Sequence, residues 1–367
     1  MEFRAAVLEA VGSPLRIDTL RLSPIGARDV LVRIRATGLC HTDLEVIQGS
    51  LAYPMPIVLG HEGAGVVEAV GSEVTRVKAG DHVIASWNPH CGHCFYCERA
   101  LPILCEPYRE HQPKGRLFDG SMHLFRGEQP VHHFFTTSTF AEYTVLSESS
   151  AIPVPKEIPF DRACVIGCGV MTGVGAVVRK ARVEPGASVL VIGCGAVGLN
   201  AIQGAVIANA GRIIALDLSA SRRAQATTFG ATDVLDAAAG DVLDRIRALT
   251  GGRGPDYVFE AAGHPGAFRL SVEAVRPGGM VVWLGKINVN EDVAFRWGSL
   301  MQEKRIVRSS YGDAIPMRDF PWLARLYLDG RLKLDEMVTN RIPLERINEG
   351  FEQLARGEGI RTVVELP

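Results

Sequence analysis

The sequence predicts an α/β protein of two domains, one mostly antiparallel β and one with a doubly wound parallel sheet. The chain has 367 residues, and single cores stop growing beyond about 250–300 residues. Its first third contains short alternating segments between Gly, Pro and Asp turns, such as 29–35 and 65–70, which is typical of antiparallel strands. From about Lys180 apolar runs alternate with Ala-rich helical stretches, which indicates parallel strands with crossover helices.

The elements of the parallel-sheet region follow this alternation in order, and a sheet of about six strands fits them. The predicted strands and helices are 188–192, 196–209, 213–216, 221–229, 257–259, 266–275 and 280–284. A helical stretch over 344–355 and an apolar strand over 362–366 end the chain, and no internal repeat is visible.

Charge and composition limit the class of partner. Lys plus Arg total 39 and Asp plus Glu total 41, a formal net charge of −2, so no basic field exists to hold nucleic acid or a membrane surface. We expect a small-molecule partner. The N-terminus lacks a basic segment followed by an apolar one, so we predict no secretory signal and a cytoplasmic location. Polar residues such as Asn200 interrupt the apolar stretch 189–211, which we interpret as buried strand plus helix.

Eight cysteines without a secretory signal favour metal binding or catalysis over disulfides. Four of them, separated by two, two and seven residues, are Cys91, Cys94, Cys97 and Cys105. Such thiolates can converge on one tetrahedral ion and fill all its positions. The spacing therefore predicts a structural zinc site.

Three further residues are candidates for a second metal site. Cys40 ends an extended run, His61 lies between glycine-rich segments, and Cys168 lies between two glycines that allow close backbone approach. Spacing alone does not bring Cys168 to the other two. From the residues alone, a metal site and ordinary buried core residues both stay open.

A glycine-rich turn follows the predicted strand 188–192 and opens a helix. In that context a Gly-x-Gly-x-x-Gly pattern predicts a dinucleotide site, because amides at the helix start face the pyrophosphate. The site comprises Gly193, Gly195, Ala196, Val197 and Gly198.

The next predicted strand ends in Asp217, nineteen residues after Gly198. A carboxylate at this place accepts hydrogen bonds from the adenosine ribose and repels a 2′-phosphate, which selects NAD over NADP. Arg222 and Arg223 lie nearby and would soften that preference if they face the ribose.

Together these motifs resemble the zinc-dependent alcohol dehydrogenases of the medium-chain family. The matching segments are 38–43, 60–65, the four-cysteine loop, 137–140, 166–169, 193–198 and 360–362. The resemblance implies a discontinuous GroES-like catalytic domain of residues 1–169 and 313–367. It also implies a Rossmann NAD-binding domain of residues 170–312, with the active site in the cleft between the domains.

By this resemblance Cys40, His61 and Cys168 hold a catalytic zinc, with Glu62 and Asp43 as nearby carboxylates. Asp43 would orient the imidazole of His61. Three protein ligands leave the fourth position to water or an alcohol oxygen, and hydride passes from the alcohol to NAD while the ion acts as Lewis acid. We therefore expect two zinc ions per subunit, one catalytic and one structural.

The resemblance also assigns residues to the pyrophosphate and to the proton path. His41 and Arg361 would meet the pyrophosphate. Thr42 would pass the proton of the alcohol onward, but the family's histidine three residues later is replaced here by Glu45. We hypothesise that Glu45 or water accepts the proton.

Apolar side chains that the resemblance places around the substrate are Leu51, Trp87, Phe134 and Phe135. They suit a primary or aromatic alcohol or its aldehyde. The glutathione-dependent formaldehyde dehydrogenases of the family use an arginine that aligns with Arg109, but the acidic residue it pairs with aligns with Leu51. Oxidation of an S-hydroxymethyl thiol adduct therefore stays an alternative.

Two other classes compete with this interpretation: a zinc-free, NADPH-dependent reductase of the same broad family, and a non-catalytic protein that retains the fold. The cysteine pattern and Asp217 argue against the first, and nothing in the sequence supports the second. The long segment from Cys105 to Phe140 resembles that of the dimeric family members. We expect a homodimer joined through the nucleotide domains, with a tetramer as the alternative.

Overall fold

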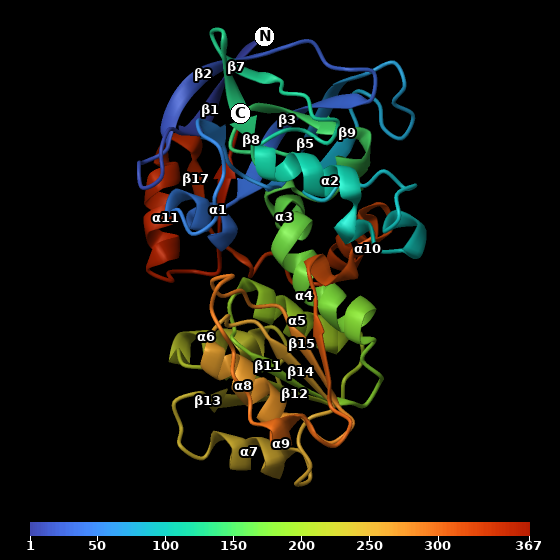
Figure 1. The fold of residues 1–367 in the computed structure, drawn as a ribbon, viewed down its shortest axis with the longest axis vertical. Coiled ribbons are helices and arrows are strands. Elements are labelled where there is room, and N and C mark those ends of the chain that lie inside the picture. Colours follow the sequence, from blue (N-terminus) through green and yellow to red (C-terminus); the bar gives the residue numbers. More distant parts are fainter. The chain divides into compact units, whose positions relative to one another are not determined.

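The computed structural model describes residues 1–367, which form two compact units (Figure 1). The first unit comprises Met1–Cys168 and Ile315–Pro367, and the second comprises Gly169–Ala314. These boundaries differ by one or two residues from the predicted ones. Within the first unit, the C-terminal strands enter a sheet built by the N-terminal part of the chain.

The first unit is mostly antiparallel, as predicted. Its closed barrel follows the order β1 (Glu2–Leu8), β2 (Arg16–Leu22), β7 (Leu124–Arg126), β8 (Gln129–His133) and β4 (Ile57–Val58). Its sheet follows the order β10 (Ala151–Pro153), β6 (His82–Ala85), β5 (Glu62–Val70), β3 (Asp29–Gly38), β18 (Arg361–Glu365) and β17 (Val338–Pro343), with β9 (Tyr143–Ser147) also paired to β3. Its helices are α1 (His41–Ile47), α2 (Glu106–His111), α3 (Phe160–Val165), α10 (Pro316–Leu328) and α11 (Ile347–Ala355).

The second unit contains the predicted doubly wound sheet, and all its strand pairs are parallel. The strand order is β13 (Asp233–Asp236), β12 (Arg212–Asp217), β11 (Ser188–Ile192), β14 (Tyr257–Glu260), β15 (Met280–Trp283) and β16 (Arg305–Arg308). Helices α5 and α8 pack against this sheet (Figure 1). The helices are α4 (Met171–Gly175), α5 (Ala196–Ile207), α6 (Ala220–Thr228), α7 (Val242–Leu249), α8 (Pro265–Ala274) and α9 (Trp297–Leu300).

No predicted element covers the helical run from Phe160 to Ala181, which contains four closely spaced glycines. Inside this run two stretches, Ile166–Val170 and Ala176–Ala181, are π-helical. The glycines are needed for packing: an added Cβ at Gly173 would lie 2.4 Å from the Val197 carbonyl oxygen. The run is long and apolar enough to cross a membrane by composition, but 72% of its most apolar window is buried inside the protein, as in a core helix.

Candidate active site

The four clustered cysteines converge in the structure on the loop that leads to α2. Their four Sγ atoms lie within 4.8 Å of one another, and all four thiols are free. The Cys91 and Cys97 sulfurs are 4.0 Å apart, close to the roughly 3.8 Å edge of a tetrahedron with metal–sulfur bonds of about 2.3 Å. The backbone amide of Glu106 lowers the pKa of the Cys94 thiol to about 6. This donor set fits a zinc ion.

A second group of metal-binding side chains gathers residues that are distant in the chain. Ligand atoms of Cys40, His61, Glu62 and Cys168 lie within 4.8 Å of one another, and the first three side chains are buried. The sequence alone left the approach of Cys168 open. The two thiols and the imidazole fit a zinc ion with three protein ligands and one exchangeable position, and the Glu62 carboxylate lies beside them.

Three separate turns position these ligands. Cys40 directly precedes α1, two residues after the end of β3, and His61 directly precedes β5. Cys168 lies in the π-helical turn Ile166–Val170, a distortion that is frequent at functional sites. A Cβ at Gly167 would lie 3.0 Å from the Ala85 carbonyl oxygen, so this glycine lets the helix approach β6 closely.

Asp43 ties two of the ligand segments together. Its Oδ2 accepts from the Cys40 amide at 3.2 Å, and its Oδ1 accepts from the Gly60 amide at 3.0 Å and from His61 Nδ1 at 3.2 Å. With Nδ1 donating to the carboxylate, the Nε2 lone pair of His61 is left for a metal ion. Burial opposes the charged ring, but the Asp43 and Cys40 charges outweigh it and raise the pKa of His61 well above its ordinary value.

The two thiols of this group share a hydrogen bond. That bond to Cys168 holds the pKa of the Cys40 thiol well below its ordinary value, while the same bond and burial raise the pKa of Cys168. A metal dication replaces the shared proton when two such thiolates bind it. The chemistry of the pair therefore agrees with metal ligation.

Arg361 forms a buried ion pair within this group. Its Nη2 lies 2.8 Å from Glu62 Oε1, and its Nη1 donates to the Leu39 carbonyl oxygen at 3.2 Å. Burial nonetheless raises the pKa of Glu62 to about 8. The guanidinium of Arg361 is thus engaged by Glu62. Its predicted contact with a pyrophosphate stays a prediction.

Helix α1 carries the residues predicted for the proton path. Thr42 Oγ1 lies 3.8 Å from the Cys40 sulfur, and Glu45 follows three residues later, on the same face of a helix. The Glu45 backbone carbonyl accepts from Leu51 N at 3.1 Å. His41 is the exposed first residue of α1, and its contact with a pyrophosphate also stays a prediction.

Aromatic rings surround His61. The Phe134 and Phe135 centroids lie 5.6 and 5.5 Å from that of His61, and Trp87 lies 5.3 Å from Phe135. Phe134 is fully buried in the core, and its place beside the substrate stays a prediction. Sequence reasoning missed Tyr53, which packs edge-on against Phe134 at 4.9 Å. Only the three-dimensional contacts distinguish it from an ordinary core tyrosine.

The segment that carries these phenylalanines is held in an unusual conformation. Phe135, Thr136 and Ser138 have φ values of 47°, 58° and 51°, which cost energy for residues other than glycine and cluster at functional sites. The Ser138 hydroxyl donates to the Val58 carbonyl at 2.9 Å, and the Thr137 hydroxyl donates to the Gly60 carbonyl at 3.1 Å. These bonds hold the segment that carries Phe134 and Phe135 against the segment that carries His61.

The three glycines of the turn between β11 and α5 differ in backbone conformation and in the space around them. Gly193 has a φ of 92°, and a Cβ at Gly198 would lie 1.8 Å from the Gly193 carbonyl oxygen. By contrast, nothing lies within 4 Å of a Cβ added at Gly195. Ala196 and Val197 begin α5. The free space at Gly195, in front of a helix start, fits a pyrophosphate.

Asp217 ends β12 beside this turn and is 8% exposed. Its Oδ2 accepts from the Cys194 amide at 2.7 Å and its Oδ1 from the Ser219 amide at 2.8 Å. Arg223 is engaged by Asp236 and by the Asp217 carbonyl, and the half-buried Arg222 acts electrostatically on Cys194. The position of Asp217 fits recognition of a ribose, with Arg222 as the neighbouring cation.

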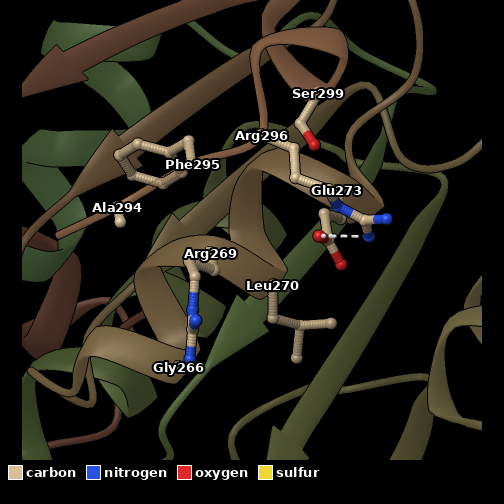
Figure 2. A pocket seen from close by; sticks show the side chains of 8 residues that line it. All are labelled: Gly266, Arg269, Leu270, Glu273, Ala294, Phe295, Arg296 and Ser299. Carbon is tan, nitrogen blue, oxygen red and sulfur yellow. Dashed lines mark hydrogen bonds and ion pairs between the residues drawn. The ribbon is translucent and has the colours of Figure 1, made fainter.

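A cavity of about 640 Å³ lies elsewhere in the second unit, between α8 and residues 294–299 (Figure 2). Arg269, Phe295 and Arg296 are among its lining residues, and Arg296 pairs with Glu273 at 3.2 Å. None of the residues predicted from the sequence as functional lines this cavity. The candidate functional residues therefore remain those of the two metal groups in the first unit and of the glycine turn in the second.

Comparison with known proteins agrees with this geometry. Two family models match: the alcohol dehydrogenase GroES-like domain over residues 26–156 and zinc-binding dehydrogenase over residues 196–329. The chain is 38% identical over 367 residues to the alcohol dehydrogenase class-3 of Myxine glutinosa, across 99% of this chain and 97% of the relative. It is 37% identical to the S-(hydroxymethyl)glutathione dehydrogenase of Aspergillus oryzae, across 99% and 96%. The crystal structure of benzyl alcohol dehydrogenase from Acinetobacter calcoaceticus superposes with a TM-score of 0.95 at 31% identity, covering 100% of both chains.

Proposed function

The chain belongs to the zinc-dependent alcohol dehydrogenases of the medium-chain family, and we propose that it oxidises primary or aromatic alcohols to aldehydes with NAD. The observation that carries the proposal is the convergence of Cys40, His61, Glu62 and Cys168 within 4.8 Å. We further propose that Cys91, Cys94, Cys97 and Cys105 hold a second, structural zinc ion.

The chain's own residues have separate tasks in this proposal. Cys40, His61 and Cys168 hold the catalytic ion, Asp43 fixes the His61 ring, and Arg361 holds Glu62 beside them. When bound, zinc acts as a Lewis acid toward the substrate oxygen and NAD accepts hydride. The turn around Gly195 receives the pyrophosphate, while Asp217 binds the adenosine ribose and favours NAD over NADP.

We assign proton removal to α1: Thr42 passes the proton of the alcohol toward Glu45. We expect Glu45→Gln to lower turnover at neutral pH about tenfold and to move the rise of kcat to higher pH, because the proton must then leave directly to water. The measurement is the pH profile of kcat for both enzymes, with Glu68→Gln, on β5, as the control. Superimposable profiles for Glu45→Gln and wild type would remove Glu45 from the proton path.

Phe135 beside His61, with Trp87 packed against Phe135, supports a primary or aromatic alcohol as substrate, since aromatic side chains favour apolar ligands. We expect kcat/KM with NAD to be highest for benzylic alcohols and to fall about tenfold in Trp87→Ala for benzylic but not for short aliphatic substrates. A steady-state survey of aliphatic, benzylic and terpenoid alcohols tests this. Equal loss for every alcohol would show that Trp87 supports the fold and does not recognise an aromatic ring.

A second candidate is oxidation of an S-hydroxymethyl glutathione adduct. It is favoured by the similarity to S-(hydroxymethyl)glutathione dehydrogenase and by Arg109, which is exposed on α2 and suits a carboxylate. Leu51 stands where the family's partner acid is expected, so this recognition is incomplete. Formaldehyde oxidation that depends strongly on added glutathione and is lost in Arg109→Ala would make this the principal activity.

For the assembly we propose a homodimer joined through the second unit. Exposed apolar side chains precede the edge strand β16: Val289, Trp297 and Met301 are 96%, 78% and 57% exposed, and such patches mark protein interfaces. We expect Trp297→Glu to convert a particle of twice 39.7 kDa to one of 39.7 kDa in light scattering, while Val234→Glu, at the opposite edge of the sheet, does not. Dimers that persist in Trp297→Glu at low micromolar concentration would contradict this interface.

A further inference from the structure

We propose that Glu260 is a positioning residue for the nucleotide: its carboxylate joins the backbone segment that packs against the glycine turn to the end of the neighbouring strand β15. The inference rests on the proposed NAD site around Gly193 and Gly195. No motif in the sequence marked Glu260, and its role follows from its place in the sheet and from its contacts.

Glu260 is the last residue of β14, fully buried and in register with Ile192 at the end of β11. The order in which the chain adds strands to the sheet reverses between these two strands, because β12 and β13 lie on one side and β15 and β16 on the other. Ligands of doubly wound sheets bind outside the carboxyl ends of the strands at such a point. The Glu260 side chain therefore lies beneath the place where a dinucleotide is bound.

One oxygen of Glu260 shapes the segment that follows β14. Oε1 accepts from the Ala262 amide at 2.9 Å and from the Gly263 amide at 2.7 Å. This segment packs directly against the first glycine of the turn, since a Cβ at Gly193 would lie 2.7 Å from the Ala262 nitrogen. A shift of residues 261–263 would therefore displace the backbone at Gly193.

The other oxygen supports the end of the neighbouring strand. Oε2 lies against Gly285, where an added Cβ would come within 2.4 Å of it, and the Gly285 amide is one of the groups that lower the pKa of Glu260. The Glu260 carbonyl also accepts from Leu284 at 2.8 Å and Gly285 at 3.0 Å. The one residue thus joins the segment beside Gly193 to the end of β15.

This arrangement is costly for the fold alone. Burial raises the pKa of Glu260 against the opposing effects of the Gly263, Ala262 and Gly285 amides and of the Arg308 charge, so the carboxylate is held where its charged form is disfavoured. The carboxylate is explained by what it fixes: the placement of residues 261–263, which pack against Gly193, relative to the end of β15.

The test compares ligands that use different parts of the site. In Glu260→Gln the neutral amide oxygen holds the two N–H groups more weakly, and an NH2 donor meets the Gly285 backbone. We expect calorimetry to show the Kd for NAD rising about tenfold, with the Kd for AMP within about twofold of wild type, because AMP depends on Asp217. Glu260→Asp keeps the charge but shortens the side chain. It should show the same change in the ratio of the NAD Kd to the AMP Kd.

The matched control is Asp256, which lies at the opposite end of β14. It accepts from the Ser188 amide at 2.7 Å and pairs with Arg276 at 2.6 Å. Asp256→Asn should lower the melting temperature and leave the NAD-to-AMP ratio unchanged. An unchanged NAD Kd in both Glu260 variants, or equal weakening of NAD and AMP, would overturn the inference. If wild type itself binds neither ligand, the proposed NAD site fails instead.

Discussion

Replacing His61 with alanine is expected to remove one of two zinc ions per chain and to lower kcat/KM for alcohols by more than about a thousandfold. Loss of a residue that merely orients a metal ligand costs about 10- to 100-fold, and His61 is itself proposed as a ligand. The ring lies in a buried group with Cys40 and Cys168, and no other imidazole is part of that group. Zinc content by mass spectrometry and steady-state kinetics measure the two effects.

The second cysteine group provides the control for this experiment. Cys105→Ser should also remove one ion, but its main effect should be a lower melting temperature, because a structural zinc site contributes directly to folding. NAD binding by calorimetry should persist in His61→Ala, since the glycine turn belongs to the second unit. Wild-type protein with NAD bound but only one zinc ion, lost in Cys105→Ser and retained in His61→Ala, would refute the catalytic site.

Gly195→Val is expected to raise the Kd for NAD about a hundredfold, which is about 2.7 kcal/mol, while leaving the melting temperature within about two degrees of wild type. A Cβ at Gly195 meets nothing within 4 Å, so the protein tolerates the side chain. The same space is where the backbone approaches the pyrophosphate, and a branched side chain would fill it. Calorimetry with NAD and thermal unfolding measure the two quantities.

Gly198→Ala is the contrasting control, because its Cβ would lie 1.8 Å from the Gly193 carbonyl oxygen. We expect this change to destabilise the fold by about 1–3 kcal/mol, as overpacking does, and to lower the yield of folded protein. Normal NAD affinity in Gly195→Val would place the pyrophosphate elsewhere and remove the basis for assigning the turn.

The parallel sheet could be predicted because its signals are local. Apolar strands such as 188–192 alternate with Ala-rich helices, and the structure contains β11 and α5 within two residues of the predicted bounds. The helical run Phe160–Ala181 could not be predicted in this way. Its glycines lower helix propensity, and their purpose, contact with the Val197 carbonyl for instance, exists only in the folded protein.

The two metal groups also differ in whether local sequence reveals them. Three cysteines within seven residues can meet one ion through local chain geometry, so spacing suggests the cluster of Cys91, Cys94, Cys97 and Cys105. Cys168 reaches Cys40 only through the packing of the helical run Phe160–Ala181 against the sheet of the first unit. The resemblance to a family implied that these two residues meet, and the residues alone did not. The pairing of Arg361 with Glu62 and the support given by Glu260 depend on similar long-range packing.

The three hydrogen bonds of Asp43 have one more consequence. They link the amide of Cys40, the amide of Gly60 and the ring of His61 through a single carboxylate, so the polypeptide sets the spacing of these groups. Exchange of zinc for cobalt should then leave the coordination geometry nearly unchanged. The visible spectrum of a cobalt-substituted protein would report the coordination geometry that the chain imposes on the bound ion.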